Sequence, residues 1–267
     1  MKITSCAKSD VGRRRPKNED RFLSNEAVDL YAVADGMGGY AGGEVASEMA
    51  VAVLDASFAP IAALPAGALS IARAAEALRS AVRLASRRIH ERKAAEPNLA
   101  QMGTTAVAML FLDDHAILAN VGDSRAYRIR DGGIEQLTAD HSLVAEQVRA
   151  GIITPEQART HRMKNWILRS VGTEGDVEVD TFIVPLEPGD HLLLCSDGLT
   201  GMLEDHEIRD AVLGATTVES AVDRLVALAN DRGGEDNVTV VLARVDALDR
   251  RATGDTTTDT LETPPPA

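Results

Sequence analysis

Residues 105–137 read TAVAMLFLDDHAILANVGDSRAYRIRDGGIEQL, and this stretch decides the fold class. It contains four strand-like apolar runs: Thr105–Leu112, Ala116–Val121, Ala126–Arg130 and Ile134–Leu137. Only short turns such as Asp113-Asp114-His115 separate them, whereas parallel strands need crossovers of about a dozen residues or more. The stretch therefore predicts an antiparallel meander.

Further elements lie on both sides of this stretch. Strand-like runs are found at Lys2–Lys8, Leu30–Ala34, Val179–Val184, His191–Cys195 and Val238–Val245. Apolar residues recur at steps of three and four in two segments, which predicts amphipathic helices there, and a third, alanine-rich segment also predicts a helix. These helices are expected at Gly67–Ala95, Val218–Asp231 and Glu44–Ser57. Helices segregated from a strand meander predict an α+β architecture in which helices cover sheets.

Two segments depart from this pattern. Asp140–Asp176 is polar and helix-prone and carries several basic side chains, so we interpret it as an insertion beside a binding site. Residues 252–267 read ATGDTTTDTLETPPPA and contain too few apolar residues to form a core. We therefore predict one domain over residues 1–246, with the insertion at about 140–176, and a disordered tail over 247–267.

Composition excludes several classes of protein. The net charge of −13 over 267 residues argues against a nucleic-acid-binding protein, because no broad basic surface can form. The only two cysteines, Cys6 and Cys195, have no CxxC spacing, which argues against a disulfide framework or a structural zinc site. No apolar run reaches the roughly 18 residues of a membrane span. We therefore expect a cytoplasmic protein without a membrane partner.

Acidic clusters occur at the ends of several predicted strands. An aspartate follows each of the apolar runs Leu30–Ala34, Ala116–Val121 and His191–Cys195 within two residues. Taken singly, such a cluster is more often a turn than a metal ligand. Several aspartates buried together, however, repel one another unless cations lie between them. Magnesium or manganese prefers such oxygen ligands, and two ions about 4 Å apart can activate water for attack on a phosphoryl group. The pattern predicts a phosphoester hydrolase.

Six motifs together resemble the protein phosphatase 2C family, the metal-dependent PPM-type serine/threonine phosphatases, over roughly Ile3 to Val245. They occur in the family's order and at similar spacing. The motifs are Arg15-Pro16-Lys17-Asn18-Glu19-Asp20, Ala34-Asp35-Gly36-Met37-Gly38-Gly39, Gly103-Thr104-Thr105, Asn120-Val121-Gly122-Asp123-Ser124-Arg125, Cys195-Ser196-Asp197-Gly198-Leu199 and Gly234-Glu235-Asp236-Asn237-Val238-Thr239.

The resemblance implies a central β-sandwich of two antiparallel sheets flanked by helices on both sides. It also implies two Mn²⁺ or Mg²⁺ ions at one end of the sandwich. Asp35 would bridge both ions, Asp197 and Asp236 would hold one of them, and the Gly36 carbonyl and a water held by Glu19 would serve the other.

The resemblance also implies roles for two residues near the ions. Asp20 would orient a water of the metal centre, and Arg15 would bind the substrate phosphate, which a guanidinium group suits. The substrates would be phosphorylated proteins, as a rule targets of a Hanks-type serine/threonine kinase. We expect a monomer.

Two positions depart from the family pattern. Some members carry a histidine that protonates the leaving group at the position of Met37. Methionine cannot do so, and in this respect the chain resembles the bacterial branch of the family. Water or an insertion residue such as His161 would then supply the proton. Gly201 stands where many members have an aspartate that helps Asp123 to hold a third ion, so a third ion would be bound more weakly or differently.

Three alternatives are weighed against this interpretation. Gly36–Ala41 fits the dinucleotide fingerprint G-x-G-x-x-A, with Asp55 about 20 residues further on, but Asp55 falls in or just after a predicted helix. For a phosphatase-like scaffold without activity, the sign would be the loss of an aspartate that holds the two ions, but Asp35, Asp197 and Asp236 are all present. A serine or cysteine hydrolase is disfavoured because G-x-S-x-G is absent and Cys195 lies inside an apolar strand.

Overall fold

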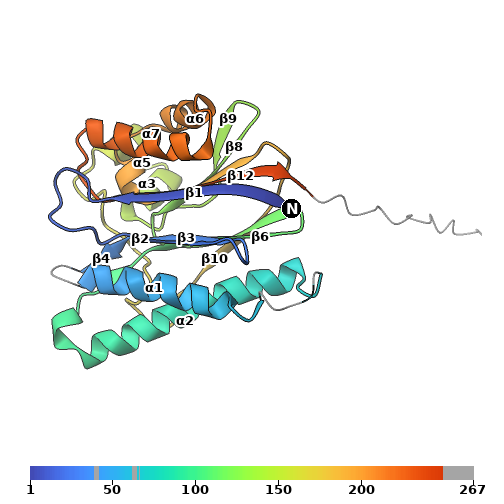
Figure 1. Cartoon of the computed structure of the whole chain (residues 1–267). Coiled ribbons are helices and arrows are strands. Elements are labelled where there is room, and N and C mark those ends of the chain that lie inside the picture. Colours follow the sequence, from blue (N-terminus) through green and yellow to red (C-terminus); the bar gives the residue numbers. More distant parts are fainter. Residues whose placement is uncertain (39–41, 62–64, 66, 249–267) are drawn as a thin grey trace, which may run out of the picture.

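The computed structural model describes residues 1–38, 42–61, 65 and 67–248, and it has the predicted α+β fold. Two five-stranded antiparallel sheets stack face to face (Figure 1). Sheet A has the order β1 (Lys2–Asp10), β12 (Val238–Ala247), β11 (His191–Cys195), β8 (Arg125–Arg130) and β9 (Gly133–Gln136). Sheet B has the order β10 (Asp180–Pro185), β7 (His115–Val121), β6 (Ala106–Leu112), β3 (Leu30–Ala34) and β2 (Arg21–Asn25).

Helices cover the outer faces of both sheets (Figure 1). α1 (Gly42–Phe58) and α2 (Ile71–Ala95) pack on sheet B, and α6 (Asp205–Leu213) and α7 (Val218–Asp231) lie over sheet A. The smaller elements are β4 (Gly36–Met37), β5 (Gly103–Thr104), the 3₁₀ turn η2 (Pro97–Leu99), α3 (Leu143–Arg149), α4 (Pro155–Arg159) and α5 (Asp197–Thr200). The α-β-β-α layering confirms the expectation from the sequence.

The apolar pattern of the central strands follows from this layering. In β3, Leu30, Ala32 and Ala34 point to the helices α1 and α2, whereas Tyr31 and Val33 point into the core between the sheets. All five residues are buried, because the strand is covered on both faces. A strand in this position is continuously apolar rather than alternating.

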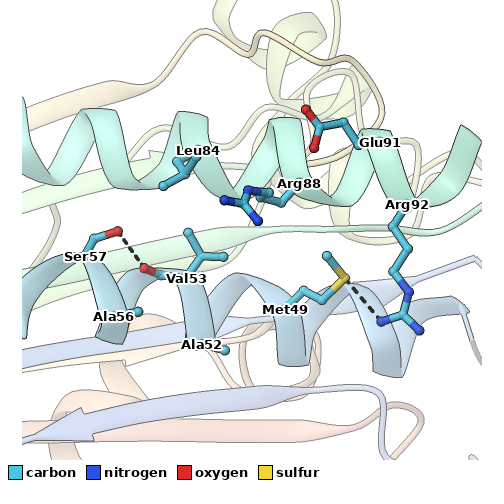
Figure 2. Close-up of a pocket in the computed structure, with 9 residues that line it drawn as sticks. All are labelled: Met49, Ala52, Val53, Ala56, Ser57, Leu84, Arg88, Glu91 and Arg92. Carbon is cyan, nitrogen blue, oxygen red and sulfur yellow. Dashed lines mark hydrogen bonds between the residues drawn. The ribbon is translucent and has the colours of Figure 1, made fainter.

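The helices α1 and α2 leave a groove of about 670 Å³ on their outer face. Figure 2 shows its lining, which includes Met49, Val53 and Leu84 and the charged Arg88 and Arg92. Arg92 Nη1 lies 3.7 Å from Met49 Sδ. The groove contains none of the residues predicted to form the active site.

The predicted four-stranded meander is wrong between its second and third strands. β6 pairs with β7 and β8 pairs with β9, but β7 belongs to sheet B and β8 to sheet A. The chain passes from one sheet to the other through Gly122, Asp123 and Ser124. Gly122 has a φ of +111°, and a Cβ atom there would lie 2.6 Å from Thr105 Cβ. A tight link of this kind has the same sequence signal as a hairpin turn.

Several element boundaries also differ from prediction. α2 begins at Ile71 rather than Gly67, because Ser70 caps it by accepting a hydrogen bond from Arg73 N. β2 and α6 were not predicted. The insertion, predicted to be helix-prone, contains the helices α3 and α4. Ala247, predicted to begin the tail, is still part of β12, and 249–267 lie outside the described residues. Among the described helices, none has the length and apolar character needed to cross a membrane.

Candidate metal centre

Strand register in sheet B brings Asp20 and Asp35 together. Arg21, the first residue of β2, pairs with Ala34, the last residue of β3. Asp20 and Asp35 each lie one position beyond this pair, on the same edge of the sheet. The neighbouring pairs β3–β6 and β6–β7 are also antiparallel, so the end of β7, followed by Asp123, reaches this edge too.

Strand register in sheet A does the same for Asp197 and Asp236. Cys195, the last residue of β11, pairs with Arg125 of β8 and with Val240 of β12. Asp197 follows β11 by two residues and begins α5. Asp236 precedes β12 by two residues. The predicted aspartates of both sheets therefore lie at one end of the sandwich.

Hydrogen bonds between the two sheets close this end. Ser196 Oγ, after β11, donates to Asp20 Oδ2 at 2.7 Å, and Glu19 N donates to Asn237 Oδ1 at 2.8 Å. Thr105 Oγ1 and Ser124 Oγ are 2.7 Å apart at the chain crossover. These bonds fix the acidic segments of one sheet against those of the other.

Mutual repulsion and burial make these carboxylates difficult to ionise. Burial raises the pKa of Asp20 to about 7 and that of Asp123 to about 8, and neighbouring carboxylates add to both shifts. Burial also raises the pKa of Asp35 well above its ordinary value, with Asp20 and Asp197 contributing. The pKa of Asp197 is raised by burial and by Asp236. These effects show that the five aspartates share one electrostatic environment.

Three carboxylate oxygens at this end are buried and have no hydrogen-bond partner within the described part of the chain: Oδ1 of Asp20, Asp123 and Asp197. An unpaired buried carboxylate oxygen is costly, and a cation removes that cost. Among the described residues, no three acidic, histidine or cysteine side chains are arranged to enclose an ion by themselves. Water would therefore complete the coordination, as is usual for magnesium. The all-oxygen donor set fits a hard divalent cation.

Gly36 and Glu19 lie beside the aspartates. A Cβ atom on Gly36 would be 2.2 Å from the Gly43 carbonyl oxygen and 2.5 Å from that of Glu19, so only glycine fits here. Asp35 is anchored through its backbone, since its N–H donates to Thr105 Oγ1 at 3.0 Å. A Cβ atom on Gly43 would lie 2.8 Å from the Gly36 carbonyl oxygen and 2.5 Å from Glu19 Oε2, so these two groups approach the same point.

Arg15 lies at the edge of the same cluster. Its Nη2 donates to Asp236 Oδ2 at 2.5 Å, and its side chain is about half exposed. The preceding backbone is held in place, because Arg13 N and Arg14 N both donate to the Gly234 carbonyl oxygen. The guanidinium group therefore borders the aspartates while remaining accessible from solvent.

The remaining predicted positions are less central. Met37 pairs with Gly103 in the small β4–β5 sheet and has no titratable proton. His161 Nδ1 accepts a hydrogen bond from Met163 N within a turn of the insertion. Gly201 ends α5 and lines a groove of about 960 Å³ together with Asp123 and Asp197.

One wall of this second groove was not predicted from the sequence. Glu204, Asp205 and His206, at the start of α6, line it opposite the insertion residues Arg159 and Lys164. Arg159 Nε and Glu204 Oε1 are 3.0 Å apart, which links the insertion to the body. The signal that could have revealed α6 is the acidic pair three residues apart, Glu204 and Glu207, which forms a capping box.

The structure disagrees with two of the alternative functions, the dinucleotide-binding domain and the cysteine hydrolase. Every pairing between named strands is antiparallel, and Asp55 lies within α1, where it accepts a hydrogen bond from Asn25 at 2.6 Å. A dinucleotide site needs a parallel sheet. Residues 39–41 of that fingerprint lie outside the described residues. Burial raises the pKa of the Cys195 thiol to about 12, which makes it an inert core residue.

Comparison with known proteins agrees with the geometry. The model of the family described as "Protein phosphatase 2C" matches residues 13–244. A serine/threonine phosphatase, stp, of Listeria monocytogenes is 42% identical over 242 residues, which cover 90% of this chain and 94% of that protein. The crystal structure of the Mycobacterium tuberculosis phosphatase PstP/Ppp superposes with a TM-score of 0.83 at 37% identity, covering 92% of this chain and 99% of that one.

A further structure bears on the metal. The catalytic domain of the phosphatase PstP, solved in complex with two manganese ions, matches with a TM-score of 0.76 at 38% identity. The match covers 91% of this chain and 97% of that domain. With its sandwich fold, its aspartates at one end and its similarity over nearly the whole length, the chain belongs to the protein phosphatase 2C family and is a metal-dependent serine/threonine protein phosphatase.

Proposed function

We propose that this phosphatase hydrolyses phosphoserine and phosphothreonine in proteins with two Mn²⁺ or Mg²⁺ ions held at the common end of the two sheets. One observation carries the proposal: buried carboxylate oxygens without partners come from both sheets and meet there. When bound, such a pair of ions polarises a phosphoryl group and lowers the pKa of water.

The ligands follow from where each residue lies. Asp35, whose pKa is raised by burial and by Asp20, Asp197, Asp123 and Asp236, would be a ligand of both ions. Asp197 and Asp236, from sheet A, would hold one ion. The Gly36 carbonyl and a water held by Glu19 would serve the other, since a Cβ atom on Gly43 would be 2.8 Å from the Gly36 carbonyl oxygen and 2.5 Å from Glu19 Oε2.

Two residues act on the reactants. Asp20 would orient the attacking water through Oδ1, the oxygen that has no partner among the described residues. Arg15 binds the phosphate of the substrate from its half-exposed position, since a guanidinium group can donate two parallel hydrogen bonds to phosphate oxygens. Met37 cannot protonate the leaving group, so water or an insertion residue such as His161 supplies that proton.

A third ion and the protein partners complete the proposal. Asp123 and the groove beside Gly201 accept a third ion only weakly, because Gly201 contributes no carboxylate. The substrates are phosphoproteins made by a Hanks-type kinase, and the enzyme acts as a cytoplasmic monomer without membrane or nucleic-acid partners. The acidic net charge of −13 and the protein phosphatases among its relatives support this assignment.

The proposal is tested by measuring Mn²⁺ binding and phosphatase activity in the same variants. Asp35→Asn and Asp197→Asn should abolish manganese-dependent hydrolysis of a phosphothreonine peptide and weaken Mn²⁺ binding in calorimetry, while circular dichroism stays unchanged. Asp131→Asn is the matched control, because Asp131 lies in the exposed β8–β9 turn, with a φ of 50° that asparagine also adopts. Full activity of the wild type in excess EDTA would refute the proposal.

A further inference from the structure

The carboxyl group of Asp20 is held on one side only. Its Oδ2 accepts a hydrogen bond from Ser196 Oγ at 2.7 Å, and the nearby Thr239 hydroxyl lowers the pKa of the carboxyl group. Its Oδ1 is buried and has no partner among the described residues. One hydroxyl group therefore bonds the side chain, a second lies near it, and one oxygen is left for another group.

The Ser196 hydroxyl can donate only in one direction. Thr239 N donates to Ser196 Oγ at 3.0 Å, and Ser196 N donates to the Thr239 carbonyl oxygen at 3.1 Å. With its oxygen occupied by the amide of Thr239, Ser196 directs its own proton to Asp20. Both residues are 0% exposed, so water does not compete for these bonds.

The Thr239 hydroxyl is directed in the same way by a second chain of donors. Asn18 Nδ2 donates to Ser9 Oγ at 2.8 Å, and Ser9 Oγ lies 2.7 Å from Thr239 Oγ1. An amide nitrogen cannot accept, so the Ser9 proton is free to point to Thr239, which leaves the Thr239 proton available for the nearby Asp20 carboxyl group. The two chains of donors converge on one carboxyl group.

We propose that Ser196 and Thr239 are positioning residues that hold the Asp20 carboxylate with Oδ1 turned toward the metal centre. The proposal rests on the role given above to Asp20 and extends it. Ser9 and Thr239 come from β1 and β12 of sheet A, whereas Asp20 leads into β2 of sheet B. The hydroxyl groups, which are fixed by sheet A, therefore restrict the orientation of Asp20 beside sheet B.

Two substitutions of Thr239 test the proposal. Thr239→Val keeps the shape of the side chain and removes the hydroxyl, and it should lower kcat for a phosphothreonine peptide about 10- to 100-fold, the effect of losing a hydrogen bond to a charged group. KM and the Kd for Mn²⁺ in calorimetry should change less than about threefold. Thr239→Ser restores the hydroxyl and should recover most of kcat. Ser196→Ala should resemble Thr239→Val, which guards against a folding defect peculiar to one variant.

A double-mutant cycle distinguishes positioning from simple structural support. If Thr239 acts through Asp20, Thr239→Val should lower kcat no further in the Asp20→Asn background. An equal loss in both backgrounds, an unchanged kcat in Thr239→Val, or full activity of Asp20→Asn would each overturn the proposal. Failure of the metal mechanism itself would show differently, as an active Asp35→Asn variant.

Discussion

Arg15 and Asp236 form an ion pair in which Nη2 donates to Oδ2 at 2.5 Å. The pair joins the proposed phosphate-binding residue to a proposed metal ligand. The hydrogen bond to Asp236 raises the pKa of Arg15, so the guanidinium group stays charged at all relevant pH values. In this position, the arginine can partly neutralise the aspartates and turn to a substrate phosphate when one arrives.

Replacing Arg15 should therefore weaken substrate binding more than it slows chemistry. We expect Arg15→Ala to raise KM for a phosphothreonine peptide about tenfold, the effect of losing a charge-assisted hydrogen bond. Steady-state kinetics at saturating Mn²⁺ would measure it. Arg14→Ala is the matched control, because Arg14 is exposed and is held only through its backbone N–H. An unchanged KM in Arg15→Ala would remove this role.

The proposed third metal site should bind its ion more tightly when Gly201 is replaced by aspartate. Gly201 has ordinary right-handed torsions, φ −67° and ψ −27°, so a side chain causes no backbone strain. Gly201→Asp adds a carboxylate to the groove that holds Asp123 and Asp197, and calorimetry with Mn²⁺ should then reveal an additional binding event. Gly201→Asn should not produce it, and neither should Gly201→Asp combined with Asp123→Asn. The same stoichiometry in Gly201→Asp as in wild type would contradict the prediction.

Divalent cations should stabilise the folded protein. The unfolded chain has no assembled aspartates, so an ion that binds only the folded state raises the free energy of unfolding by about 2.7 kcal/mol at a concentration of 100 Kd. Thermal denaturation with and without Mn²⁺ would show this as a higher Tm that EDTA reverses. Asp35→Asn should lose the shift and Asp131→Asn should keep it. A wild-type Tm that does not respond to Mn²⁺ would argue against a metal site between the sheets.

His141 should make the base of the insertion sensitive to acid. Its Nδ1 accepts a hydrogen bond from Gly122 N at 3.0 Å, which requires the unprotonated nitrogen, and its Nε2 lies 3.2 Å from Asp180 Oδ2. Burial lowers the pKa of His141, Arg169 and Arg149 lower it further, and Asp180 opposes them. The folded state thus binds the proton less readily than the unfolded state.

The sign of the pH effect follows from this shift. The contribution of His141 to stability is complete above pH 6.5, the ordinary histidine pKa, and decreases as the pH falls through the lower pKa of the folded state. The wild type's excess in free energy of unfolding over His141→Gln should therefore fall by at most about 1.4 kcal/mol per pH unit. The fall occurs between pH 6.5 and the lower pKa of the folded state. Urea denaturation of both proteins at pH 8 and pH 5.5 would measure it, since the carboxylates that they share cancel in the difference. A difference independent of pH would contradict the assignment.

Much of the proposed site follows from the sequence, because its proposed ligands stand where strands end. Asp35 comes directly after an apolar run and Asp197 two residues after another, and glycines beside them indicate close backbone approach. Antiparallel pairing then brings these strand ends to a common edge. The local pattern and the chemistry of carboxylates were sufficient for this part of the prediction.

What could not be predicted depends on contacts between distant segments. In the sequence, the link at Gly122 resembles a hairpin turn. Only the packing of the two sheets makes it a crossover from sheet B to sheet A. The Ser196 and Thr239 hydroxyls stand within the motifs, but their partner Asp20 is about 180 and 220 residues away in sequence. Serine and threonine are compatible with many environments, so residue type alone does not reveal a positioning role.

The order of strands in sheet A has a consequence for how the enzyme matures. β12 lies between β1 and β11, and the proposed metal ligand Asp236 precedes it by two residues, so both are synthesised after every other strand of the two sheets. A nascent chain that has not reached β12 would have an open gap beside β1 and an incomplete set of proposed ligands. We therefore expect phosphatase activity to begin only after translation has passed β12, and chains terminated before it to have none.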